Sequence, residues 1–139
     1  MKKSGSEFEE DIYKQLLTSN LAKGISGKVY RKGMRPRNSQ KEDVIVTFKT
    51  GLDGQIQNGF VVVNTYVPDI LSGTDKLQDI SHCKFIERLS YQFIETLKIS
   101  GYKFELTNII QSFQLEESAK DYEQHFVHFE IYFEYATLS

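Results

Sequence analysis

The sequence predicts an α+β fold, a two-layer sandwich in which two helices cover a mostly antiparallel five-stranded sheet. Two segments, at about 6–18 and 79–99, carry apolar residues at helical spacing. Shorter segments between and after them alternate apolar and polar residues, as half-buried strands do. The expected order is one helix, three strands, a second helix and two strands. Because the strands come in runs with short links, we expect them to pair antiparallel.

The first helix is predicted over residues 6–18. Ser6 and Glu9 have the spacing of a capping box, in which each side chain bonds to the other residue's backbone amide. The apolar residues of this segment recur every four positions, at Phe8, Ile12 and Leu16. Gly24 lies beyond the expected end of the helix.

Three strands are predicted before the second helix. The first is a short segment at 27–30, and the second begins at Val44 with a clear alternation of apolar and polar residues. Turn residues at 51–54 join it to a third strand at about 56–67. Pro68 cannot donate to a strand ladder, so it ends that strand.

The second half of the chain predicts a helix at 79–99 and two closing strands. The helix follows a loop at Ser72 and Gly73, and its buried stripe is predicted to consist of Ile86, Leu89, Phe93 and Leu97. A strand over 102–115 changes its apolar parity near Asn108, which predicts a bulge or strong twist there. A polar loop at 116–123 precedes the last strand. The residues of that strand expected to face the core are Val127, Phe129, Ile131, Phe133 and Tyr135.

Composition indicates one globular domain of 139 residues, 40% of them hydrophobic. The longest apolar run, at 60–63, is far too short to span a membrane, and no signal-peptide core follows Met1. Cys83 is the single cysteine, so an intramolecular disulfide is excluded and a zinc site is disfavoured. We therefore expect a soluble, cytoplasmic protein.

No pattern of catalytic residues stands out. The three histidines are His82, His125 and His128. The last two are expected on opposite faces of one strand, and adjacent helical residues such as His82 and Cys83 do not face each other. A nuclease-like set has only generic spacing; it consists of Asp43, Lys49 and Glu105. We predict no catalytic residue, no cofactor, no metal and no enzymatic activity.

The most informative feature is the segregation of charge. Residues 23–41, here called the basic segment, contain seven basic side chains and no Asp or Glu, whereas the rest has ten basic against nineteen acidic ones, a net charge of −9. Such polarity favours contact with something negative. Gly33 and Pro36 break regular structure, so 31–41 is predicted to be an exposed, mobile loop. The predicted interaction residues are Lys28, Arg31, Lys32, Arg35, Arg37 and Lys41.

Three interpretations of the basic segment remain open at this point. It could grip nucleic-acid phosphates without reading bases, dock against an acidic protein surface, or serve only solubility as a solvated loop. Under the first two, we expect replacement of Arg31, Lys32, Arg35 and Arg37 with Ser to leave the fold intact and to weaken partner docking.

The order of the predicted elements and the sequences of several segments resemble those of a known protein family. The segments are Ile25-Ser26-Gly27-Lys28-Val29-Tyr30, Arg35-Pro36, Glu42-Asp43-Val44-Ile45-Val46 and Gly59-Phe60-Val61-Val62-Val63-Asn64. With a leading helix, a long second helix and two closing strands, the chain resembles phage tail-completion, or tail-terminator, proteins from about residue 8 to 135.

The resemblance implies a subunit of a phage or prophage particle that forms a ring, commonly a hexamer. Such a ring ends the tail tube and joins the tail to the head, so the implied partners are further copies of the chain, tail-tube proteins and head-connector proteins. Contact with DNA in the lumen is an alternative role for the basic segment, and no membrane is implied. The approximate contact regions are 31–41 and 43–66. The implied location is the host cytoplasm during assembly and the virion afterwards; a head-closure or neck protein is a rival within the same class.

Overall fold

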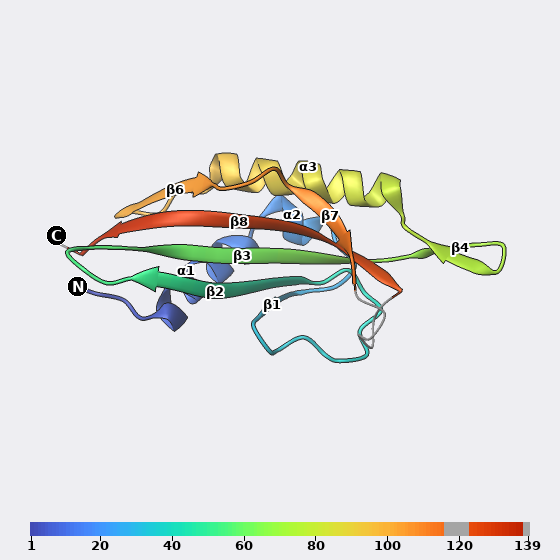
Figure 1. Cartoon of the computed structure of the whole chain (residues 1–139), viewed down its shortest axis with the longest axis horizontal. Helices are drawn as coiled ribbons and strands as arrows, with labels where there is room; N and C mark the ends of the chain where they lie inside the picture. The colour runs from blue at the N-terminus through green and yellow to red at the C-terminus, as the bar shows by residue number, and fades with distance from the viewer. Residues whose placement is uncertain (116–122, 138–139) are drawn as a thin grey trace.

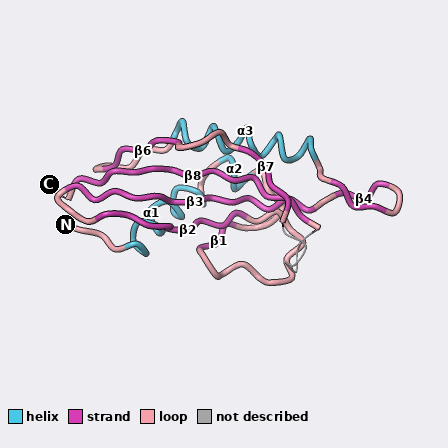
Figure 2. Tube along the Cα trace, viewed as in Figure 1, coloured by secondary structure: helices cyan, strands magenta, loops and turns pink. Residues whose placement is uncertain are grey.

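The computed structural model describes residues 1–115 and 123–137. Within these residues it is an α+β fold with a mostly antiparallel sheet and three helices, which confirms the predicted class (Figures 1 and 2). Most of the predicted loop at 116–123 lies outside the described residues. The helices are α1 (Gly5–Leu17), α2 (Asn20–Lys23) and α3 (Ile80–Thr96). The strands are β1 (Val29–Arg31), β2 (Val44–Leu52), β3 (Ile56–Pro68), β4 (Ile70–Ser72), β5 (Asp75–Leu77), β6 (Tyr102–Leu106), β7 (Gln111–Gln114) and β8 (Gln124–Ala136).

The main sheet has the order β1-β2-β3-β8-β6, with β7 also paired to β8. β1 and β2 are parallel, and the other pairs are antiparallel. A parallel pair needs a connection that returns along the strands, and residues 32–43 provide it. We call these residues the crossover loop. The crossover loop contains four of the seven basic side chains of the basic segment. The parallel pairing of β1 and β2 therefore places these four side chains in a connection outside the strands.

Two counts differ from the prediction. The main sheet has six strands rather than five, and the described residues contain three helices rather than two. The extra strand arises because the predicted strand 102–115 is divided into β6 and β7. Leu106 pairs with Ile131 and Gln111 with His128, so β8 advances three residues while the other chain advances five. The surplus residues leave the ladder, and Ile110 turns into the core, where it is buried.

The first helix is capped two residues earlier than predicted. Ser4, not Ser6, is the N-cap, and its side chain accepts from the Glu7 amide while a Glu7 carboxylate oxygen accepts from the Ser4 amide. Both serine–glutamate pairs have the capping-box spacing. The predicted partner, Glu9, instead accepts hydrogen bonds from Arg31 and from the Phe48 amide, so its carboxylate is engaged across the sheet.

The helices and the sheet meet along the predicted apolar faces. Phe8 of α1 lies 4.5 Å from Phe133 between ring centroids, and Phe93 of α3 lies 6.3 Å from Phe129. Phe129 and Phe133 point to the same face of β8, so both helices pack on that face. The predicted alternation of β8 is confirmed for its four buried members, which are Val127, Phe129, Ile131 and Phe133.

A second, separate sheet was not predicted. β4 and β5 form a hairpin in which Ser72 pairs with Asp75 across a two-residue turn. Gly73 begins this turn at a φ of 65°, a conformation that favours glycine in tight hairpin turns. Figure 1 shows the hairpin extending beyond the end of the main sheet, at the end opposite to both termini. The Gly73 signal was present in the sequence, but three-residue strands are too short for periodicity to reveal them.

Candidate interaction surface

The structure divides the basic segment into two groups of side chains. Arg31 and Arg35 are bound within the chain, as described below. The other five side chains are exposed and form no ion pair with any residue of 1–115 or 123–137; they are Lys23, Lys28, Lys32, Arg37 and Lys41. Of the six predicted interaction residues, four therefore keep their charge available to a partner.

Arg31 fixes the end of β1 to the first helix. Its Nε donates to Glu9 Oε1 at 3.0 Å, and a terminal nitrogen donates to the Ser6 carbonyl at 2.8 Å. The other carboxylate oxygen of Glu9 accepts from the Phe48 amide of β2 at 2.9 Å. One carboxylate thus joins α1, β1 and β2, and the Arg31 charge is used in positioning these elements.

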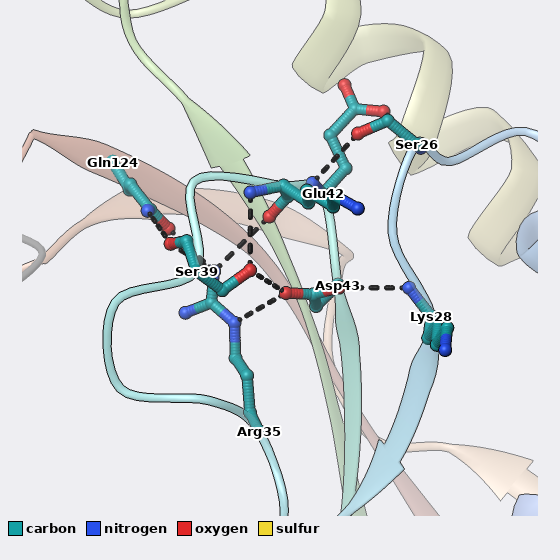
Figure 3. Close-up of polar contacts among 8 residues, drawn as sticks. Ser26, Lys28, Arg35, Ser39, Glu42, Asp43 and Gln124 are labelled. Carbon is teal, nitrogen blue, oxygen red and sulfur yellow. Dashed lines mark hydrogen bonds and ion pairs between the residues drawn. The ribbon is translucent and has the colours of Figure 1, made fainter.

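Arg35 is buried, which corrects the expectation that 31–41 is exposed throughout. Only 8% of its side chain is accessible, and its Nε lies 2.9 Å from Oδ2 of Asp43, which is 1% accessible. A terminal nitrogen donates to Gln124 Oε1 at 3.1 Å and to the Lys41 carbonyl at 3.2 Å (Figure 3). The guanidinium also stacks 4.3 Å above the Tyr66 ring. A planar group with five donors suits this site, because acceptors converge on it from β8, from Asp43 and from the loop backbone.

Asp43 is the centre of this network. Its Oδ1 accepts from the Lys28 amide at 2.9 Å, and its Oδ2 accepts from Ser39 Oγ as well as from Arg35. Burial would by itself raise the pKa of the Asp43 carboxyl, but the bonds from Ser39 and the Lys28 amide, with the Arg35 guanidinium, hold that pKa below its ordinary value. The carboxylate stays ionised, and it ties Arg35 and Ser39 of the crossover loop, together with the Lys28 amide before β1, to the start of β2.

Gly27 can lie close to Asp43 and to the Glu42 carbonyl because it has no side chain. A Cβ placed on Gly27 would lie 1.9 Å from Asp43 Oδ1 and 2.4 Å from the Glu42 carbonyl oxygen. The Gly27 amide donates to that same carbonyl at 2.9 Å. The glycine therefore lets the chain before β1 pass directly against the Asp43 network.

A hollow of about 530 Å³ opens beside this network. Tyr30 and Pro36 supply its apolar wall, and the exposed Lys28 and Lys41 stand among its lining residues. Because Asp43 lines the hollow and holds the surrounding backbone, the hollow is built into the fold rather than dependent on a ligand. It combines an apolar wall with positive charge.

The hairpin forms a second unusual surface. Its large apolar side chains are exposed: Leu71 is 69% accessible, and Ile70 and Leu77 are at least half accessible. Ile80, the first residue of α3, is exposed as well. The base of the hairpin is held by an ion pair of 2.9 Å between Lys76 and Glu123. Exposed apolar residues gathered on a projecting element are a signal of a binding surface, and sequence analysis missed it along with the hairpin.

Acidic residues are also concentrated around the β4–β5 hairpin. Asp69, Asp75, Asp79 and Glu123 lie in or beside the hairpin, and Lys76 is the one cation between residues 69 and 80. Asp69 is bonded to His125, and Asp79 caps α3 through the His82 amide. Asp75 is exposed and bonds to no other described side chain. The hairpin end is therefore negative, in contrast to the basic segment.

The residues considered for chemistry do not converge. His125 bonds to Asp69, whereas His128 bonds to Asn64 from β3, and His82 contacts Glu42. Lys49 pairs with Glu130 at 2.9 Å and not with Asp43. No group of three or more His, Cys, Asp or Glu able to hold a metal occurs among residues 1–115 and 123–137.

Comparison with known proteins assigns no family. No helix in the described part of the chain is long and apolar enough to cross a membrane. No protein-family model matches the chain, and no curated protein matches it significantly.

Proposed function

We propose that this protein is a structural assembly subunit that forms a ring with copies of itself, and that the ring ends the tail tube of a phage or prophage particle and joins it to the head. One observation carries the self-assembly: an exposed apolar hairpin projects beyond the sheet on which it is built. A two-stranded hairpin is at best marginally stable in water, so apolar side chains on it are best accounted for by a contact that covers them.

The charge distribution supports a head-to-tail contact. The subunit of this proposal is a two-layer sandwich with a negative hairpin end and a positive basic segment. Two unlike surfaces on one subunit favour a heterologous interface, which generates a ring when the rotation between neighbours closes. The resemblance to tail-completion proteins adds the hexamer as the expected ring, tail-tube and head-connector proteins as further partners, and the host cytoplasm and then the virion as the location. No catalytic step belongs to this role.

A nucleic-acid-binding protein is the second candidate, favoured by the five exposed cations of the basic segment. It is weaker because Arg31 and Arg35 already serve the fold. At most five phosphate contacts remain in this segment. The logarithm of the binding constant should then fall with the logarithm of salt concentration with a slope of roughly −4 to −5 for duplex DNA.

The mass of the purified chain at several concentrations separates the two candidates. We expect native mass spectrometry to find one discrete multiple of the monomer, and negative-stain microscopy to show rings of that stoichiometry. Anisotropy of a labelled DNA duplex, recorded from about 50 to 200 mM salt, should show weak binding. A chain that stays monomeric at every concentration and binds the duplex with the steep salt slope would replace the ring proposal with the second candidate.

A further inference from the structure

We infer that the β4–β5 hairpin of one copy docks into the hollow beside the crossover loop of the next copy. This inference rests on the proposed self-assembly and names the two surfaces that form the ring contact. The occupant of the hollow is a second copy of this chain.

The two faces of the hairpin differ in charge. Ile70 and Leu77 are a cross-strand pair and share one face with Asp75, while Leu71 and Lys76 pair on the other face. Ile70, Leu77 and Asp75 are all exposed in the single subunit. A hollow that receives the Ile70–Leu77 face therefore removes apolar area from water and receives a carboxylate with it.

The hollow offers matching chemistry. Tyr30 and Pro36 form an apolar wall that can receive the Leu77 side chain, which shares its face with Asp75. Lys28 and Lys41, both exposed, stand where the Asp75 carboxylate beside the hairpin turn would arrive. Opposite charges around an apolar contact set its register and speed its formation.

The receiving surface is prepared before contact. The buried Arg35–Asp43 pair and the Lys28 amide bond hold the backbone on either side of the hollow (Figure 3). A site whose backbone is already ordered loses less conformational entropy on binding than a flexible loop does. The buried Arg35 thereby shapes the site, and the exposed Lys28 and Lys41 attract the hairpin.

The contact must join different copies. Figure 1 shows the hairpin extending beyond the end of the main sheet. None of the residues that line the hollow belongs to the hairpin, so one subunit does not fill its own hollow. Each subunit then gives a hairpin and receives one, which is the geometry of a head-to-tail ring.

Site-directed disulfide cross-linking tests the contact directly. Leu77→Cys and Gln40→Cys variants, each with the buried Cys83 replaced by Ala, are mixed and oxidised. Gln40 lines the hollow. We expect a cross-linked dimer from the mixture and only background from either variant alone. The matched control mixes Leu77→Cys with Gln55→Cys, because Gln55 lies in the β2–β3 turn at the other end of the sheet and should not couple.

Charge reversal gives an independent test that needs no new cysteine. Asp75→Lys or Lys41→Asp alone should raise the self-dissociation constant about tenfold or more, and the two together should restore most of the loss. Sedimentation velocity measures the constant, and circular dichroism verifies the fold of each variant. Rings that form without the 77–40 cross-link and without charge rescue would overturn the inference and leave the ring proposal standing. A wild-type chain that stays monomeric at all concentrations would overturn both.

Discussion

The guanidinium of Arg35 and the carboxylate of Asp43 form an ion pair of 2.9 Å inside a segment whose composition indicates only solvent-exposed charge. The pair joins the middle of the crossover loop to the start of β2, and Gln124 of β8 completes it. The loop is consequently part of the folded core at one point and a charged surface elsewhere.

Replacement of Arg35 should therefore lower the free energy of unfolding of the protein. Arg35→Ala removes one partner of a buried pair and leaves Asp43 without its cation, a change that typically costs about 3–5 kcal/mol. Urea-induced unfolding at neutral pH measures the free energy of unfolding. Arg37→Ala is the matched control, because that exposed side chain should change the free energy by less than about 0.5 kcal/mol. Equal effects of the two changes would contradict the assigned burial.

The Asp43 carboxylate should make the free energy of unfolding depend on pH in the acidic range. Its folded-state pKa lies below the ordinary value of 3.8, so its contribution is complete above about pH 4 and is lost as the pH falls through the folded-state pKa. Asp43→Asn should lower the free energy of unfolding at pH 7 and reduce its dependence on pH below about 4. Unfolding curves of both proteins at pH 7, 5, 4 and 3 test this. A difference between them that is as large at pH 3 as at pH 7 would rule out the linkage.

A side chain at residue 27 should disrupt the same network. In Gly27→Ala the added methyl group would overlap Asp43 Oδ1 and the Glu42 carbonyl, so either the carboxylate or the strand entry must move. We expect a loss of about 1–3 kcal/mol in the free energy of unfolding, as for other overpacked sites. Gly54→Ala is the control, since the nearest atom to a Cβ there is 3.3 Å away. Thermal unfolding of the two variants under identical conditions compares them.

The exposed cations should affect assembly and not folding. Combined replacement of Lys28, Lys32, Arg37 and Lys41 with Ser should leave the melting temperature nearly unchanged and weaken self-association. The control removes four exposed cations elsewhere, namely Lys84, Arg88, Lys98 and Lys103. Sedimentation at matched ionic strength separates a local effect from one of net charge, because both variants change the net charge equally. Similar weakening in both would argue against a contact at the basic segment.

The ion pairs of Arg31 and Arg35 lead to a different prediction for these two positions than the sequence does. A variant with serine at both positions should unfold more readily, since each arginine holds a partly or fully buried carboxylate.

Cys83 should react with thiol reagents only after unfolding. Its side chain is within the core and burial raises the pKa of the thiol, so little thiolate is present or reachable at neutral pH. Labelling with a chromogenic disulfide should be slow in buffer and fast in denaturant. Rapid labelling of the folded chain would show that the start of α3 opens.

The sequence by itself determined the class of fold, the approximate extent of α1 and α3, the β2–β3 hairpin and the inward-facing residues of β8. These follow from periodicity and turn residues, which are local properties of the chain. The sequence also showed where basic and acidic residues are segregated, because this can be counted along the chain without a structure. Only the tertiary structure decided which charges are available. Arg31 meets Glu9 and Arg35 meets Gln124 across separations of 22 and 89 residues, and no local pattern records such distant partners. Tertiary structure likewise decided that Ser4 caps α1, since Glu9 is engaged by Arg31, and that a short apolar hairpin stands apart from the core. A side chain's burial depends on what the rest of the chain brings to it, and that is a property of the folded whole.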